Sequence, residues 1–254
     1  MAASINNGWV NFRASNFMAQ HTSKIANNVT RLSGNTKFAT GADNPSGFAY
    51  WQKLRSAATI ATQTIENVQN AQTKAKIAGS AYGSALDALA QAKDLAAQAD
   101  ANAENTATSN ADAVSALQGQ IANISAAATF NGTTVLGNIK FNMASDNGTT
   151  AEKTVALDAI TTPSGTTADA IQTEIETLLA SQAEAGGAEA GLGYLADFLT
   201  SKAAYMQEAA ANVGNVNITT EFSDYVSNQI ALQSAQFIAA QQNQNAYSVL
   251  NLLK

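Results

Sequence analysis

The feature that most constrains this chain is a heptad pattern that runs without a break from Leu54 to Ala96. Its inward positions are Leu54, Ala58, Ala61, Ile65, Val68, Gln72, Ala75, Gly79, Tyr82, Leu86, Leu89, Lys93 and Ala96. Alternating steps of three and four residues over this length are typical of a coiled-coil helix. At about 1.5 Å per residue that helix is roughly 65 Å long, longer than a typical domain is wide. The pattern therefore predicts a rod.

The composition agrees with long, thin helical packing. Hydrophobic residues make up 46% of the chain but aromatic residues only 7%, so most of the apolar content is alanine. Alanine favours helix and lets two helices approach closely, but it buries little area. The chain has only two prolines, which would otherwise break long helices.

Further helices and one hairpin are expected to complete the rod. Asn44-Pro45 predicts the start of the long helix, and a second stripe, ending at Ala128, predicts a helix that packs back against it. Alternation around Asp146-Asn147-Gly148 predicts a β-hairpin at about 137–160. A shorter helix from about residue 168 is expected to end in a flexible connector, Glu184–Gly193, before another heptad stripe. The expected rod core comprises Leu54, Ile65, Val68, Leu86, Leu89, Leu117, Ile121, Leu195, Leu199 and Met206.

Both ends of the chain carry helical apolar stripes with no evident partner. The first stripe is Met18, Thr22, Ile25, Val29 and Leu32, and Gly34–Asp43 interrupts the helix after it. The last helix is expected after a cap at Thr219-Thr220 and carries a polar run, Gln241–Asn245. We expect a terminal pair of helices whose apolar residues pack against other subunits. The candidates are Ile5, Trp9, Phe12, Met18, Ile25, Val29, Leu32, Phe222, Val226, Ile230, Phe237, Tyr247, Leu250 and Leu253.

Several function classes are excluded by charge and residue types. A net charge of −6 with scattered Lys and Arg argues against nucleic-acid binding. Cysteine is absent, and His21 is the only histidine, which rules out a zinc site of the H-E-x-x-H type. Paired acids such as Glu174 with Glu176, or Glu184 with Glu189, lie in hydrophilic surroundings, and Gly186–Gly193 lacks the ending of a phosphate-binding loop. We therefore expect no catalytic residue, cofactor or metal, and no enzymatic activity.

Three separated blocks resemble bacterial flagellin, the subunit of the flagellar filament. They are RLSGNTKFATGADNPSGFAYWQKLRS (31–56), ISAAATFNGTTVLG (124–137) and the C-terminal EFSDYVSNQIALQSAQFIAAQQNQNAYSVLNLLK. The resemblance implies a mainly α fold: a long antiparallel helical rod with a small β-hairpin at 44–217, and a terminal coiled-coil domain with a spoke loop, built from 1–43 and 218–254. Large outer domains are missing, because only about fifty residues separate the matched halves.

The resemblance also implies a function and partners. The chain is expected to polymerise with itself into an extracellular filament that drives swimming, and to meet an export chaperone, filament cap proteins and hook-associated proteins. No stretch approaches the roughly twenty apolar residues of a membrane span, and the N-terminal residues do not look like a cleaved signal peptide. The resemblance implies instead that the chain is exported through the flagellar type III apparatus.

Two rival readings and one family property are tested on residues. A hook–filament junction protein shares the terminal pattern, but FNGTTVLG and SVLNLLK favour flagellin. A secreted helical adhesin would need aromatic and polar groups converging on a pocket, whereas Trp9 and Trp51 lie within residues 1–137, most of which the resemblance covers. Many flagellins bind an animal immune receptor through an Arg, a Leu and a Glu. The corresponding positions of this chain hold Gln91, Leu95 and Ala113. Only the leucine is present, which argues against receptor activation.

Overall fold

The protein is mainly α-helical, as the sequence predicts. The computed structural model describes residues 2–101, 107–162 and 165–252, with side chains for 9, 11–99, 101, 108–162, 165–241 and 244. The helices are α1 (Ala2–Gly34), α2 (Pro45–Ala101), α3 (Ala107–Ala127), α4 (Ala168–Gly214) and α5 (Ile218–Leu252). The strands are β1 (Thr129–Phe130), β2 (Thr133–Thr134), β3 (Ile139–Ala144) and β4 (Thr150–Val155).

Contacts divide the chain into two compact units. One contains residues 56–206, and the other combines 1–55 with 207–254. The division falls inside α2 and α4, whereas the boundaries expected from the sequence, 43/44 and 217/218, follow the ends of the helices. The two units are described separately below.

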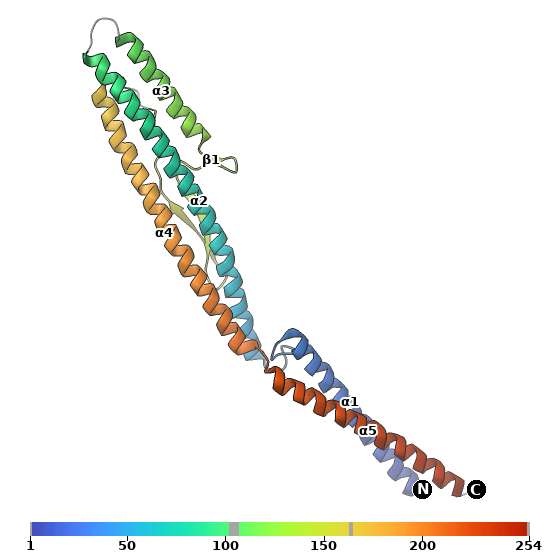
Figure 1. Ribbon diagram of the computed structural model, residues 1–254. Coiled ribbons are helices and arrows are strands. Elements are labelled where there is room, and N and C mark those ends of the chain that lie inside the picture. The colour runs from blue at the N-terminus through green and yellow to red at the C-terminus, as the bar shows by residue number, and fades with distance from the viewer. Residues whose placement is uncertain (1, 102–106, 163–164, 253–254) are drawn as a thin grey trace. The chain divides into compact units, whose positions relative to one another are not determined.

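In the unit of residues 56–206, α2 and α4 run antiparallel and side by side, with α3 alongside α2 (Figure 1). Lys93 Nζ donates to Gln172 Oε1 at 2.7 Å, and Lys76 Nζ lies 3.5 Å from Glu189 Oε1. All positions of the predicted heptad register in α2 are buried or half-buried. Most of the buried residues of α2 as a whole are alanines, so the helices pack largely through small side chains.

The expected connector at Glu184–Gly193 is wrong, because α4 continues through it as one helix. A glycine in a helix costs about 1 kcal/mol relative to alanine, but tertiary packing supplies most of the stability of such helices. Ala185 and Leu192 within this stretch are buried in the core shared with α2. Gln72 Nε2 of α2 also donates to the Glu189 carbonyl at 3.3 Å. Packing against α2 therefore keeps the glycine-rich stretch helical.

The predicted hairpin is formed by β3 and β4, which pair antiparallel from Ile139 opposite Val155 to Ala144 opposite Thr150. Its turn has Gly148 at a φ of 83°, a conformation that favours glycine. Asn67 Nδ2 of α2 donates to the Asn142 carbonyl at 3.1 Å, and Lys202 of α4 pairs with Asp146 at 2.6 Å. These contacts fasten the hairpin to both long helices.

A second, shorter hairpin was not expected. Asn131 and Gly132 end the helical periodicity as predicted, but with φ values of 51° and 75° they also form the turn between β1 and β2. Such consecutive positive φ values are those of a tight hairpin turn, for which Asn-Gly is the preferred pair.

In the unit of residues 1–55 and 207–254, α1 and α5 run antiparallel along each other (Figure 1). Asn44 Oδ1 accepts a hydrogen bond from Gly47 N at 2.9 Å, so Asn44 caps α2 ahead of Pro45, as predicted. The cap of α5 is Asn217, whose Oδ1 accepts from the amides of Thr219 and Thr220. The expected cap at Thr219-Thr220 is therefore wrong, because these residues are the donors.

An aromatic cluster joins the loop after α1 to the start of α2. Phe38, Phe48 and Trp51 have ring centroids 5.7–6.0 Å apart, and the Arg55 guanidinium lies over the Trp51 ring. The Lys37 amide donates to the carbonyl of Gly214, the last residue of α4, at 2.6 Å. Loop, α2 and α4 are thereby tied together in this unit.

Candidate assembly surface

The seam between α1 and α5 combines apolar residues, many of them small, with a set of buried or half-buried polar side chains. Its buried and half-buried residues on α1 are Asn11, Ala14, Met18, His21, Ile25, Asn28, Arg31 and Leu32, and on α5 they are Glu221, Tyr225, Asn228, Ala231, Leu232, Ala235 and Ala239. Thr22 and Val29 of the predicted stripe are exposed, and His21 and Asn28 take their places. Little large apolar surface is thus buried between these two helices.

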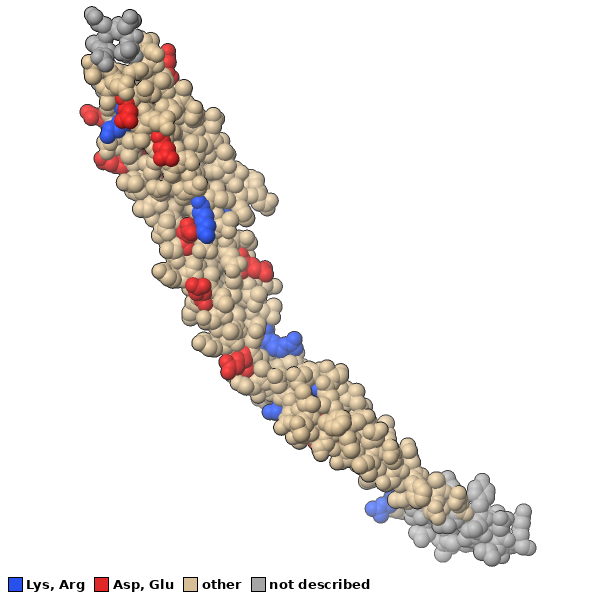
Figure 2. Space-filling model, viewed as in Figure 1, with Lys and Arg blue, Asp and Glu red and all other residues tan. Residues whose placement is uncertain are grey.

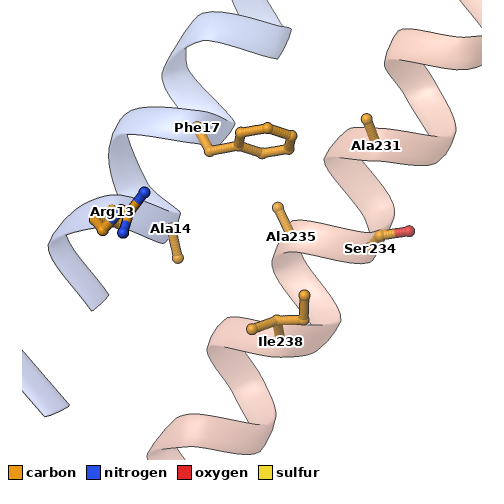
Figure 3. Close-up of a pocket in the computed structure, with 7 residues that line it drawn as sticks. All are labelled: Arg13, Ala14, Phe17, Ala231, Ser234, Ala235 and Ile238. Carbon is orange, nitrogen blue, oxygen red and sulfur yellow. The ribbon is translucent and has the colours of Figure 1, made fainter. Parts of the chain in front are cut away.

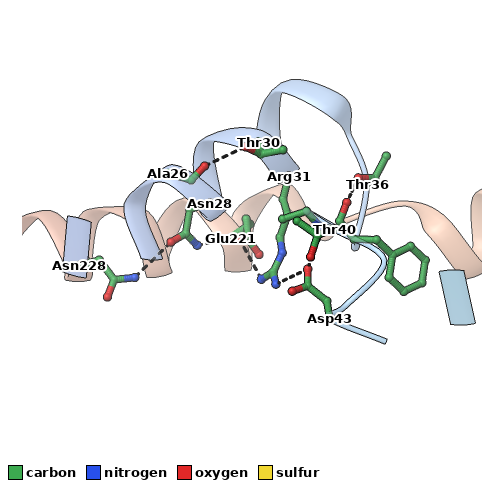
Figure 4. Close-up of polar contacts among 11 residues, drawn as sticks. Ala26, Asn28, Thr30, Arg31, Thr36, Thr40, Asp43, Glu221 and Asn228 are labelled. Atoms are coloured by element: carbon green, nitrogen blue, oxygen red, sulfur yellow. Dashed lines mark hydrogen bonds and ion pairs between the residues drawn. The ribbon is translucent and has the colours of Figure 1, made fainter. Parts of the chain in front are cut away.

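A polar ladder crosses the seam (Figure 4). His21 Nδ1 lies 2.9 Å from Asn228 Oδ1, and Asn228 Nδ2 donates to Asn28 Oδ1 at 3.2 Å. Asn28 Nδ2 donates to Glu221 Oε1 at 2.6 Å. Asn28 and Glu221 are only 5% and 8% exposed, so the seam contains a carboxylate that needs its partners.

Arg31 extends the ladder into the loop after α1. Its guanidinium lies 3.6 Å from Glu221 Oε1 and 3.1 Å from Asp43 Oδ2. The hydrogen bond from Arg31, with those from the Ala39 and Thr40 amides, holds the pKa of Asp43 below its usual value. Arg31 thereby links the loop to the helix seam.

Many of the large apolar residues of α1 and α5 are exposed rather than buried in the seam. Trp9 and Phe12 on α1 are each 64% exposed, and Phe237 on α5 is 71% exposed. Among the other predicted packing residues, Val29, Phe222, Val226 and Ile230 are also exposed, whereas Met18, Ile25 and Leu32 are half-buried. The side chains of Ile5, Tyr247 and Leu250, and all of Leu253, lie outside the described residues. The structure also exposes Phe17, Ile218 and Ile238, which the sequence analysis did not single out.

An apolar groove opens between the two helices. It has a volume of about 490 Å³ and is lined by Arg13, Ala14, Phe17, Ala231, Ser234, Ala235 and Ile238 (Figure 3). Alanines on both sides leave the seam incompletely filled at this level. The groove therefore adds concave apolar surface to the exposed apolar faces.

The predicted rod-core residues lie in or beside a continuous core. Val68, Leu89, Ile121 and Leu199 are buried in it, and Ile65, Leu86, Leu117 and Leu195 pack against it. Leu54 is buried and Met206 is half-buried. One exposed row was missed: Tyr194, Phe198 and Tyr205 follow one face of α4, and Tyr194 is 76% exposed. Their spacing of four and then seven residues was the available signal.

The described residues offer little for chemistry. They contain no group of three or more His, Asp or Glu side chains able to hold a metal, and none of their helices is long and apolar enough to cross a membrane. Charged side chains are scattered over a mostly uncharged face (Figure 2). His21 belongs to the helix seam, and Glu174 and Glu176 accept hydrogen bonds from Thr161 and Gln172.

The three positions that the resemblance aligns with receptor-binding residues do not form an exposed set. Gln91 is exposed on α2, whereas Leu95 on α2 and Ala113 on α3 are half-buried.

Comparison with known proteins finds a flagellin family model and flagellar relatives. Residues 5–141 match the family model of the bacterial flagellin N-terminal helical region. The chain is 25% identical to flagellin FlaB2 of Treponema pallidum (strain Nichols), covering 92% of this chain and 94% of that protein. It is also 25% identical to the flagellar filament 33 kDa core protein of Treponema phagedenis, covering 96% and 99%.

Proposed function

Because this chain belongs to the bacterial flagellin family, we propose that it is a structural subunit that polymerises into the flagellar filament, the helical propeller of swimming cells. The relative in Treponema phagedenis is named as a filament core protein, and the chain matches nearly all of it. The role is mechanical: the filament lies outside the cell and transmits the rotation of a motor as thrust.

One observation carries this proposal: the largest apolar side chains of α1 and α5 are exposed and lie outside the seam between the two helices. Complete burial of such a side chain contributes about 1.5–3 kcal/mol. Because Trp9, Phe12, Phe222, Ile230 and Phe237 are all exposed, much of that free energy is left unused in the single chain. Large exposed apolar surfaces mark sites of protein association. Neighbouring copies packed around α1 and α5 would bury it.

The two expected domains receive separate roles in this proposal. Residues 1–43 and 218–254 form the filament core, where terminal helices of many copies pack together, and residues 44–217 form the rod outside that core. The exposed row of Tyr194, Phe198 and Tyr205 on α4 supplies apolar surface for contacts between rods. Contacts through the many small side chains permit two close packings, which would allow the filament to change its curvature.

Three further partners follow from the family and the exposed helix faces. Before assembly, an export chaperone would cover the apolar face of α5 by binding the helix in a groove. Filament cap proteins and hook-associated proteins would meet the same terminal helices at the two ends of the filament. The chain would reach them through the type III flagellar export apparatus.

Electron microscopy of the full-length protein after seeding tests the proposal. The parent chain is expected to grow filaments, and Phe237→Ala is expected to raise the critical concentration about tenfold or more, because about 1.4 kcal/mol of burial is lost per contact. Gln236→Ala, which changes the adjacent exposed polar residue, is the matched control and should assemble like the parent. Absence of filaments from the seeded parent would refute the proposed function.

A further inference from the structure

Apolar burial alone does not decide how α1 and α5 pair. Some apolar residues of α5, such as Phe222 and Ile230, are exposed outside the seam. Others, such as Ala231 and Ala235, lie in the seam itself. Beyond the ladder the seam contains alanines at Ala14, Ala231 and Ala235, whose contacts depend little on the alignment. Some other interaction must select one alignment.

The polar ladder has the geometry to make that selection. Its two rungs, His21 with Asn228 and Asn28 with Glu221, are separated by one heptad on both helices. Asn228 Nδ2 links the rungs by its hydrogen bond to Asn28 Oδ1. Every side chain in this ladder is buried or half-buried.

A shift of one heptad would break this arrangement. A one-heptad shift of α5 that keeps Asn228 beside Asn28 would put Ala235 in the place of Asn228 next to His21, which would then have no amide partner. Glu221 would lose the hydrogen bond from Asn28. An unpaired buried polar group costs about 1–3 kcal/mol, more than the small apolar side chains can return.

We propose that His21, Asn28, Glu221 and Asn228 are positioning residues that hold α1 and α5 in a single antiparallel register. A polar residue in an otherwise apolar seam can specify register at some cost in stability. The register in turn decides which large apolar residues remain exposed for neighbouring copies. This last consequence rests on the proposed function, whereas the register itself does not.

Cysteine cross-linking measures the register directly, because the natural chain contains no cysteine. Ala14→Cys with Ala235→Cys reports the observed register, since these residues lie one heptad beyond the His21 rung and face the same groove (Figure 3). Ile25→Cys with Ala235→Cys reports a shift of one heptad: Asn228 bonds both His21 and Asn28 and so lies level with Ile25, whereas Ala235 is one heptad further along α5. Each pair is introduced into the full-length chain and oxidised after seeding. Intrachain disulfides are then separated from interchain ones on a non-reducing gel. A variant that does not assemble is oxidised as the soluble chain under the same conditions.

The comparison is between Asn28→Leu/Glu221→Leu and a matched control. Asn27→Leu places the same side chain on the neighbouring exposed position of α1. With the parent ladder and with the control, the first cysteine pair should form its intrachain disulfide and the second should not. In the double variant the ratio of observed to shifted cross-links should fall about tenfold, as expected from the loss of a hydrogen bond to a charged group.

An unchanged ratio in the double variant would overturn the inference. So would loss of both disulfides together, because the ladder would then be needed for pairing itself and not for its register. A parent chain that forms no filaments but keeps the predicted cross-link ratio would refute the proposed function and leave the register intact.

Discussion

Two glycines of the same helix are expected to respond in opposite ways to alanine. A Cβ at Gly214, at the end of α4, would overlap Nε1 and Cδ1 of the Trp51 indole and lie 2.8 Å from Cε2. A Cβ at Gly187, in the middle of α4, would meet nothing within 4 Å. Neither glycine has a positive φ, so alanine is conformationally allowed at both.

The magnitudes follow from helix propensity and overpacking. Gly187→Ala should stabilise the protein by about 0.5–1 kcal/mol, because alanine loses less entropy in a helix. Gly214→Ala should destabilise it by about 1–3 kcal/mol, because the rigid indole must leave its position beside Phe38 and Phe48. For a chain of this size, 1 kcal/mol corresponds to about 2–4 °C in Tm.

Thermal unfolding followed by circular dichroism and by tryptophan fluorescence measures both effects. Trp9 is exposed, so a change in the fluorescence of the folded protein would report mainly on Trp51. We expect a lower Tm and a shifted emission spectrum for Gly214→Ala, and a higher Tm with an unchanged spectrum for Gly187→Ala. A Gly214→Ala variant with the parent's Tm and spectrum would show that Trp51 does not pack on the end of α4 as described.

Two other predictions concern assembly and pH. Deleting Ser248–Lys254, which removes four apolar residues (Val249, Leu250, Leu252 and Leu253), should abolish filament growth in light scattering, while circular dichroism shows the rod still folded. Normal growth of the truncated chain would contradict this prediction. Tyr82 is buried and donates to the Asp158 carbonyl, and burial raises the pKa of its phenol to about 12. Its neutral form therefore stabilises the fold below pH 10, and this contribution is lost between pH 10 and about 12. Tyr82→Phe should lower the free energy of unfolding at pH 7 by about 1 kcal/mol and flatten its fall over that alkaline range, measured by urea unfolding. An equally steep fall in the variant would assign the pH dependence to other groups.

Local signals in the sequence were sufficient for most of the rod. The spacing from Leu54 to Ala96 repeats so regularly that it defines both the helix and its inward face. Asn44-Pro45 and Asp146-Asn147-Gly148 act through the hydrogen bonds and φ values of their own residues, so their effects could be predicted without knowing any partner. The mainly α fold with one main hairpin was predictable for the same reason.

Other features depended on contacts between distant segments. Glycine spacing at 186–193 predicted a break, but packing of Ala185 and Leu192 against α2 outweighed the intrinsic cost of the glycines. The terminal stripe predicted that Thr22 and Val29 lie on the inner face of α1. The residues found on that face are their neighbours, His21 and Asn28.

The physical reason is that a terminal helix has two surfaces to satisfy. Apolar periodicity by itself determined that α1 and α5 would be helices with faces to bury. It did not determine which face would meet the helix's own partner and which would stay exposed, because both choices bury apolar groups. Only the tertiary structure decided this, by pairing Asn28 with Glu221 and His21 with Asn228 across the seam and leaving Phe12 and Phe237 exposed. Hydrogen bonding of buried polar groups depends on both helices at once, so neither helix's sequence could reveal it alone.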